Sequence, residues 1–222
     1  MQKNIRIKPA NRQEEQASID IILQGVKDNI KSKRQLFLLQ RKFCEKYKIN
    51  FVSNPVLLNT YRILLKEKKI TENKDLFELL RKRRIRTSSG IASVAVLTKP
   101  YECPGKCVFC PTQEDIPKSY IDNEPAVMRA VLAKFDPISQ MQIRLRGFKL
   151  AGNPADKIEL IVMGGTFSYL PKDYQLKFIV SCFAACNRFD NKLQMSKFKR
   201  QIKPKMSNNQ LLQLLKKEQK RD

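Results

Sequence analysis

Apolar residues in the first ninety positions recur at the three- and four-residue spacing of amphipathic helices. Four such stripes follow one another, and each places its apolar side chains on one helix face. Asn54 and Pro55 stand before the third stripe, and this pair is typical of a helix start. The pattern therefore predicts a helical region over residues 1–86. The stripes are Ile19, Ile22, Leu23 and Val26; Leu36, Leu39, Phe43 and Tyr47; Leu57, Leu58, Tyr61, Leu64 and Leu65; and Leu76, Phe77, Leu79 and Leu80.

The pattern changes at residues 87–90, where small polar residues and Gly90 mark a turn. Short β-prone runs at 91–97 and 158–163 predict two buried strands. The alternation of strands and helices predicts an α/β fold with parallel strands, in an open sheet or a barrel. Residues 99–123 are expected to form a long loop. Helices are expected at about 124–134, 136–150 and 170–187, and one more around Leu211, Leu212, Leu214 and Leu215.

Charge is distributed unevenly along the chain. The 222 residues carry 44 basic and 21 acidic side chains, a net charge of +23, of which residues 1–90 contribute +13, residues 91–186 contribute +2 and residues 187–222 contribute +8. Such an excess indicates an acidic partner, with nucleic acid first and an anionic membrane surface second. Most single charges also fit a solvated helix face. The run at 81–86 is denser, and its candidate RNA-binding residues are Arg81, Lys82, Arg83, Arg84 and Arg86.

The chain contains no histidine. This excludes a Ser-His-Asp triad, a Cys-His pair and a zinc site with histidine ligands. No apolar stretch approaches the roughly 18 residues of a membrane-spanning helix, and residues 1–16 lack the apolar core of a secretory signal. We expect a cytoplasmic protein without membrane attachment, in which cysteines stay reduced and bind metal or pack in the core.

The strongest chemical signal is the C-x3-C-x2-C motif of Cys103, Cys107 and Cys110, in the loop after the first predicted strand. Three thiolates at this spacing can face one ion or cluster. A structural zinc ion needs four ligands, and the fourth would have to come from Cys44, Cys182 or Cys186. A [4Fe–4S] cluster with three protein ligands and one open iron is the other solution. Because Cys182 and Cys186 stand at helical i, i+4 spacing, their ordinary interpretation is one buried helix face.

The cysteine motif after a first parallel strand resembles that of radical S-adenosylmethionine enzymes. In that superfamily an aromatic residue commonly precedes the last cysteine, as Phe109 does here. A glycine-rich turn after the second strand commonly binds S-adenosylmethionine (SAM), and Gly164, Gly165 and Thr166 stand at that place. Glycines there allow a ligand to approach the backbone and leave amide donors free.

Further motifs resemble one family of that superfamily, the Elongator protein 3 family of tRNA uridine acetyltransferases. The resemblance is close over about residues 80–186. The region before them resembles the family only in its general character, which is basic and helical. The motifs are Ala95-Val96-Leu97-Thr98-Lys99-Pro100, Cys103-Pro104-Gly105-Lys106-Cys107-Val108-Phe109-Cys110-Pro111, Pro117-Lys118-Ser119-Tyr120, Glu124-Pro125-Ala126-Val127-Met128-Arg129-Ala130, Phe135-Asp136-Pro137 and Val162-Met163-Gly164-Gly165-Thr166-Phe167.

This resemblance implies modification of carbon 5 of the wobble uridine in tRNA, with a [4Fe–4S] cluster, SAM and acetyl-CoA. In such an enzyme the cofactors perform the radical reaction and the protein binds and orients them. Because hydrogen-atom abstraction needs no general base, the lack of histidine does not exclude this reaction. By position, Cys103, Cys107 and Cys110 are the cluster ligands, and Phe109, Gly164, Gly165 and Thr166 bind the cofactor. Lys118 and Tyr120 are candidate catalytic residues. The residues implied to meet the tRNA backbone are Arg81, Lys82, Arg83, Arg84 and Arg86.

The family also carries a GNAT-type acetyltransferase domain after the radical domain, and a TIM-like barrel needs on the order of 200 residues. We therefore expect a truncated version, with the barrel incomplete and the acetyltransferase domain absent. The expected parts are a tRNA-binding region at 1–86, a partial radical SAM domain at 87–187 and a basic tail with one helix at 188–222. Expected partners are tRNA and either a missing half or other Elongator-type subunits. The alternatives are a non-catalytic tRNA- or RNA-binding fragment and a structural zinc-binding nucleic-acid protein.

Overall fold

A computed structural model describes residues 8–82, 84–202 and 206–220 of the chain. They divide into two compact units. Unit 1 comprises residues 1–91 and 147–156, and unit 2 comprises residues 92–146 and 157–222. The fold is mixed α/β and mostly helical, with one small parallel sheet in the described part of the chain, which confirms the predicted fold class at that level.

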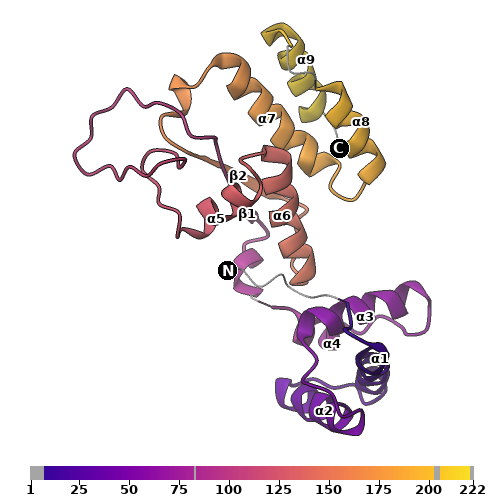
Figure 1. The fold of residues 1–222 in the computed structure, drawn as a ribbon. Coiled ribbons are helices and arrows are strands. Elements are labelled where there is room, and N and C mark those ends of the chain that lie inside the picture. Colours follow the sequence, from indigo (N-terminus) through magenta and orange to yellow (C-terminus); the bar gives the residue numbers. More distant parts are fainter. Residues whose placement is uncertain (1–7, 83, 203–205, 221–222) are drawn as a thin grey trace. The chain divides into compact units, whose positions relative to one another are not determined.

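Four α-helices lie wholly within the described residues of unit 1, and they match the four apolar stripes of the sequence. They are α1 (Arg12–Lys27), α2 (Lys33–Lys46), α3 (Asn54–Lys66) and α4 (Lys74–Leu80) (Figure 1). Side chains cap three of their N-termini, because Asn11, Ser32 and Asn73 each accept a hydrogen bond from a backbone N–H of the first turn. At α3 the N-cap is Ser53, one residue before the predicted Asn54, and no side chain caps it. The Asn54 amide donates instead to Leu80 O at 3.4 Å.

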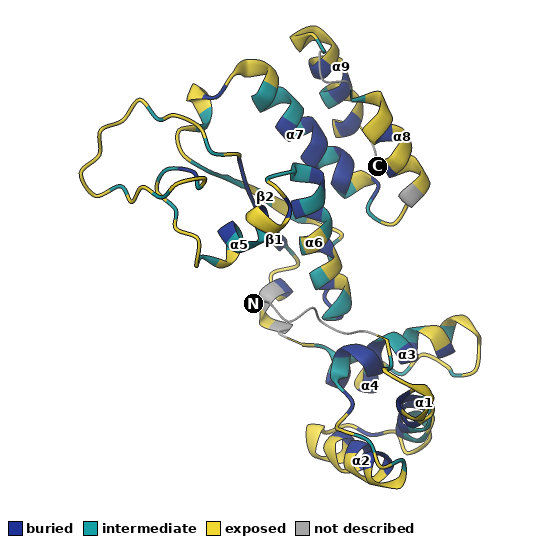
Figure 2. Ribbon diagram, viewed as in Figure 1, coloured by how far each residue is buried: buried dark blue, intermediate teal, exposed yellow. Residues whose placement is uncertain are grey.

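The core of unit 1 is built from the inward faces of these helices, seen as the buried positions in Figure 2. Ile22, Leu57 and Leu76 are fully excluded from solvent there. Tyr61 is buried among them, and its hydroxyl accepts a hydrogen bond from Asn73 N at 2.8 Å. A buried phenol therefore keeps its polar end satisfied while it ties α3 to the start of α4.

Unit 2 is organised around strands β1 (Ala92–Leu97) and β2 (Ile158–Met163). They pair in parallel, with Ala92 opposite Ile158 and Leu97 opposite Met163. Helices α5 (Pro125–Leu132) and α7 (Lys172–Asn187) lie in the same unit, as does α6 (Pro137–Leu150) up to Arg146. β1 is buried as predicted. The prediction of a buried β2 was wrong, because Ile161 is 41 % exposed and Glu159 is also exposed. Its apolar run lies at the edge of the described sheet.

The end of β1 is held by two helices. The buried Gln140 of α6 accepts a hydrogen bond from Leu97 N and donates one to Leu97 O, both at 2.8 Å. A side-chain amide thus satisfies both backbone groups of Leu97. Two residues later, Lys99 N–H donates to the Tyr174 hydroxyl of α7 at 2.9 Å. The start of the long loop after β1 is therefore fixed in position by α6 and α7.

Two helices follow α7, where the sequence pattern indicates only one. They are α8 (Lys192–Gln201) and α9 (Asn208–Gln219), and α9 packs along α7 (Figure 1). In α8 only Met195 and Phe198 are buried apolar residues among many lysines, a stripe too sparse to read from the sequence. None of the described helices is long and apolar enough to cross a lipid bilayer.

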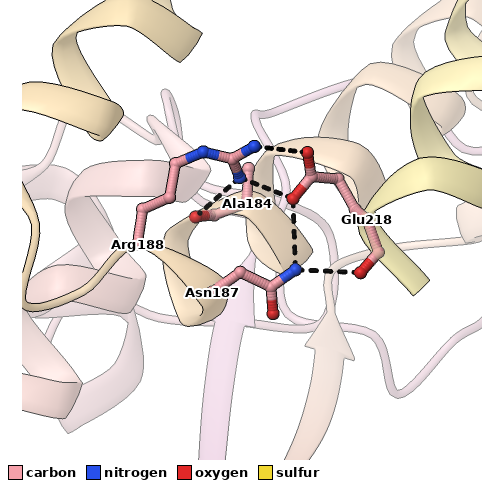
Figure 3. A network of polar contacts seen from close by, with 4 residues as sticks. All are labelled: Ala184, Asn187, Arg188 and Glu218. Carbon is pink, nitrogen blue, oxygen red and sulfur yellow. Dashed lines mark hydrogen bonds and ion pairs between the residues drawn. The ribbon is translucent and has the colours of Figure 1, made fainter. Parts of the chain in front are cut away.

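A buried ion pair fastens α9 to the end of α7 (Figure 3). Arg188 Nη1 and Nη2 lie 2.5 and 2.6 Å from the two carboxylate oxygens of Glu218, and these side chains are only 7 % and 1 % exposed. The Asn187 amide donates to Glu218 O at 2.9 Å and to Glu218 Oε2 at 3.1 Å. The Arg188 guanidinium also lies 4.7 Å from the centre of the Phe198 ring of α8.

Replacing Glu218 with alanine leaves the Arg188 charge buried without its partner, and we expect this to destabilise the packing of α9 on α7 by about 3–5 kcal/mol. The control is Glu45→Ala, which removes the exposed Arg41–Glu45 pair of α2 and should leave stability unchanged. Hydrogen exchange of the α7 and α9 amides, measured as a function of urea concentration, gives the change in free energy of unfolding. Equal protection in both variants would contradict the role given to the buried pair.

Candidate functional site

The candidate site lies at the edge of the sheet where both strands end. Because β1 and β2 are parallel, the loops after Leu97 and Met163 leave from the same edge, and Thr98 N–H donates to Met163 O at 2.9 Å there. The two loops enclose an open cavity of about 490 Å³. Its lining residues are Cys103, Gly105, Lys106, Cys107, Cys110, Thr112, Lys118, Ser119, Gly164, Gly165 and Thr166.

Gly164 turns the chain at the end of β2. Its φ of +145° is a conformation that side chains rarely allow, and a Cβ at this position would collide with the Thr98 hydroxyl. Glycine is therefore required for the close approach between the two loops. A Cβ on the neighbouring Gly165 would lie 3.7 Å from Lys118 Cβ, so the glycine turn also faces the loop that carries the cysteines.

Cys103 lies among polar groups where the two loops meet. Its sulfur lies 3.5 Å from the Thr166 hydroxyl oxygen, so the two segments of the cavity wall touch here. The hydrogen bond from Thr166, supported by the Gly105 amide and the positive charge of Lys118, lowers the pKa of the Cys103 thiol. A slight burial opposes this without reversing it. The site thus favours the thiolate, which is the form that binds metal.

Cys110 is held by a residue from the far side of the long loop. Its sulfur lies 3.0 Å from the Ser119 hydroxyl oxygen. Ser119 has a φ of +75°, an uncommon backbone conformation for serine, and its N–H donates to Pro111 O at 3.3 Å. Next to it, Lys118 Nζ donates to the Thr112 hydroxyl at 2.6 Å. The loop therefore folds back on itself and brings Lys118 and Ser119 to the cysteine motif.

The donor set of this cavity suits an iron–sulfur cluster. Three thiols, two hydroxyls beside them and the cations Lys106 and Lys118 share one cavity, and cysteine is the usual ligand of such clusters. No three cysteine, aspartate or glutamate side chains among the described residues already converge as a metal site. The three cysteines of the motif would therefore have to rearrange when a cluster binds, in a loop that is exposed over most of its length (Figure 2).

The other three cysteines lie in apolar surroundings. Burial raises the pKa of the Cys182 thiol far above its ordinary value and that of Cys186 to about 11, so both stay protonated at neutral pH. The interpretation of Cys182 and Cys186 as a buried helix face is consistent with these positions on α7. Cys44 belongs to the hydrophobic core of unit 1. None of these described thiols has the environment of a ready zinc ligand.

Two of the predicted cofactor-binding and catalytic residues lie outside the cavity lining. Phe109 is 97 % exposed, although its neighbours Cys107 and Cys110 line the cavity. Tyr120 is partly buried and packs against a small cluster that includes Leu97 and Val127. Of the candidate catalytic pair, only Lys118 therefore reaches the cavity. Residue patterns do not single out Thr112 and Ser119, although Ser119 stands in the Pro117–Tyr120 motif.

The basic run at 81–86 begins inside the fold of unit 1. The Arg81 side chain is 16 % exposed and pairs with Glu78 at 2.5 Å and with Asn153 Oδ1 at 3.2 Å. It packs against Gly152, whose φ is +79° and where a Cβ would lie 2.7 Å from Arg81 Cγ. Lys82 is exposed. Arg83 lies outside the described residues, and Arg84 and Arg86 belong to a short 3₁₀ helix, Arg84–Thr87.

No family model matches the chain. Comparison with individual known proteins gives matches whose names agree with one another. The chain is 46 % identical over 127 residues to the tRNA uridine(34) acetyltransferase of Methanocaldococcus infernus, a match that covers 54 % of this chain and 24 % of that protein. It is 37 % identical over 160 residues to Elongator complex protein 3 of Saccharomyces cerevisiae (67 % and 28 %) and 36 % identical over 181 residues to that of Drosophila melanogaster (76 % and 32 %).

The matches confirm the predicted resemblance. The relatives named as tRNA uridine(34) acetyltransferases define a class of tRNA-modifying enzymes. The chain is similar to members of that class and to the proteins named Elongator complex protein 3. The matched part spans about a quarter to a third of the length of these relatives.

Replacing Thr166 with valine keeps the side-chain shape and removes the hydroxyl beside Cys103. Because a hydrogen bond to the thiolate lowers the pKa, its loss should raise the pKa of Cys103 and shift the alkylation profile to higher pH. The measurement is the rate of iodoacetamide labelling against pH in the metal-free chain. Trypsin cleaves after Lys106, so Cys103 is quantified on a peptide separate from Cys107, the internal control. An unchanged Cys103 profile would refute the contact.

Proposed function

We propose that this chain acts in tRNA uridine(34) modification, as a protein of the Elongator protein 3 type that holds a [4Fe–4S] cluster and SAM. The observation that carries the proposal is the single cavity lined by Cys103, Cys107 and Cys110 from one loop and by the Gly164–Gly165–Thr166 turn from the other. Fold alone would not support a reaction, but a site with these donors does. The similarity to named tRNA uridine(34) acetyltransferases gives the substrate class.

In this proposal Cys103, Cys107 and Cys110 ligate the cluster. The lowered pKa of Cys103 favours a thiolate ligand there before the metal arrives, and the Ser119 hydroxyl lies beside the Cys110 sulfur. A bound cluster with one open iron, reduced by an external one-electron donor, would supply an electron to SAM, and acetyl-CoA would supply the acetyl group that the relatives' name implies. Radical chemistry of this kind needs no histidine, which agrees with a chain that contains none.

The glycine turn binds SAM in this proposal. Without side chains, Gly164 and Gly165 let a ligand lie against the backbone, and their amides can donate to its carboxylate. Lys118 holds an ammonium group in the same cavity, where it attracts anionic groups of a cofactor or of the RNA. Strands β1 and β2 are taken as the first two strands of the radical SAM barrel, with the ligand at their carboxyl ends as in other parallel α/β folds.

The excess positive charge of the first ninety residues, +13, supports tRNA binding by unit 1. Lys82, Arg84 and Arg86 are the members of the basic run that we assign to phosphate contacts. Arg81 also carries charge, but its pairing with Glu78 and Asn153 gives it a structural role within unit 1. Elongator-type subunits are the proposed protein partners, by analogy with the relatives named as members of that complex.

Anaerobic reconstitution with iron and sulfide tests the cluster. The unaltered chain should take up about four irons per chain, and the triple variant of Cys103, Cys107 and Cys110 to alanine should take up none. Cys44→Ser is the matched control, because its thiol is buried in unit 1, and it should retain full iron content. Metal analysis by mass spectrometry gives the result. A chain that binds zinc and rejects iron would contradict the proposal and favour a structural zinc site.

Salt dependence of tRNA binding tests the basic run. Replacing Lys82, Arg84 and Arg86 together with glutamine should weaken binding of all tRNAs about equally and lower the slope of log affinity against log salt by about one per lost phosphate contact. Binding is measured by fluorescence anisotropy at several salt concentrations. Lys197→Gln, an exposed charge on α8, is the control. If the control loses as much slope per charge as the triple variant, the contacts are non-specific and the assignment is wrong.

A further inference from the structure

Unit 1 carries an exposed aromatic pair that the proposed site does not use, formed by Phe37 of α2 and Phe51 of the loop after α2. Phe37 and Phe51 are 53 % and 51 % exposed, and their ring centres lie 5.5 Å apart at an interplanar angle of 33°. Leu38, next to Phe37 on α2, is also 53 % exposed. Single exposed apolar residues are common, but adjacent large ones on one surface mark an interaction site.

The fold of unit 1 holds these two rings outward. The opposite face of α2 is buried in the core through Leu36 and Leu39, which fixes the rotation of the helix and turns Phe37 to solvent. Phe51 precedes Val52, which is fully buried and whose carbonyl accepts a hydrogen bond from the buried Gln40 amide of α2 at 3.0 Å. Both rings are therefore attached to fixed backbone.

The rim of the aromatic pair is basic. One turn before Phe37 stand Lys33 and Arg34, and one turn after it stands Arg41, all exposed. Lys48, three residues before Phe51, is exposed as well. The only acidic residue of α2 is Glu45, and its carboxylate lies 2.7 Å from Arg41 Nε. The rings thus stand in a positive field.

Flat apolar rings within a positive rim match one kind of partner better than others. Single-stranded nucleic acid offers unpaired bases that stack on aromatic side chains and phosphates that meet lysine and arginine. A protein partner would need an apolar surface with acidic residues around it, and no other feature among the described residues of unit 1 points to one. A paired duplex would satisfy the charges but leave the rings without a base to stack on.

We infer that Phe37 and Phe51 form a stacking platform for unpaired bases of an RNA loop, with Lys33, Arg34, Arg41 and Lys48 on its phosphates. The identity of that RNA as tRNA rests on the proposed function, whereas the stacking itself does not. The platform adds a preference for unpaired over paired RNA, which a basic surface alone does not supply.

The absence of tryptophan from the sequence makes this directly measurable. In the full chain, Phe37→Trp introduces a single indole at the platform. Its fluorescence should be quenched by an RNA hairpin with an unpaired loop and unaffected by a blunt duplex of equal length at the same occupancy. No quenching by the hairpin at saturation would overturn the inference, and quenching by an added apolar peptide alone would mark a protein-docking surface instead.

A second set of variants measures the energy. Phe37→Leu with Phe51→Leu keeps the apolar character but removes the rings, and affinity for the hairpin should fall by at least about tenfold with an unchanged salt slope. Leu38→Ala, an exposed apolar neighbour without a ring, should bind like the unaltered chain. Equal affinity of the double leucine variant and the unaltered chain would contradict this inference alone. No RNA binding by the unaltered chain would contradict the tRNA part of the proposed function as well.

Discussion

The parallel pairing of β1 with β2 is the constraint on which the candidate site depends. The register places Leu97 opposite Met163, so the cysteine loop and the glycine turn, more than forty residues apart in sequence, leave the sheet side by side. An antiparallel pairing would send them to opposite edges. The Gln140 amide and the Tyr174 hydroxyl then hold the first residues of the cysteine loop, and Gly164 permits the close contact with Thr98.

The same residue type has opposite chemistry in two parts of unit 2. Cys103 stands in an open cavity with a hydroxyl, a backbone amide and a lysine charge around it, and its pKa is lowered. Cys182 is buried in α7 among apolar groups, and its pKa is raised. Surroundings, and not the cysteine count, therefore separate the thiols suited to metal from those suited to packing. This separation favours a three-cysteine site over a zinc site completed by a helix cysteine.

Periodicity was sufficient to predict the helices of unit 1, because each buries a regular face, and short β-prone runs were sufficient to predict both strands. It missed α8, whose buried positions are too few, and it overstated the burial of β2. The Arg188–Glu218 pair could not be predicted from the sequence, because the two residues lie 30 positions apart and residues of both types usually lie on the protein surface. The cysteines and the glycine turn were predicted together. The contact of Ser119 with Cys110 was not, because it depends on a left-handed backbone conformation that residue patterns do not encode.

We propose that the two loops at the strand ends form one site, in which the cysteines hold a cluster and the glycine turn holds SAM. The most direct measurement is the electron paramagnetic resonance spectrum of the reduced, reconstituted chain with and without SAM. We predict a changed spectrum on addition of SAM to the unaltered chain and to Gly147→Ala, where added bulk meets nothing within 4 Å, and no change in Gly164→Ala. If SAM left the cluster spectrum of the unaltered chain unchanged, the proposal of one shared site would be wrong.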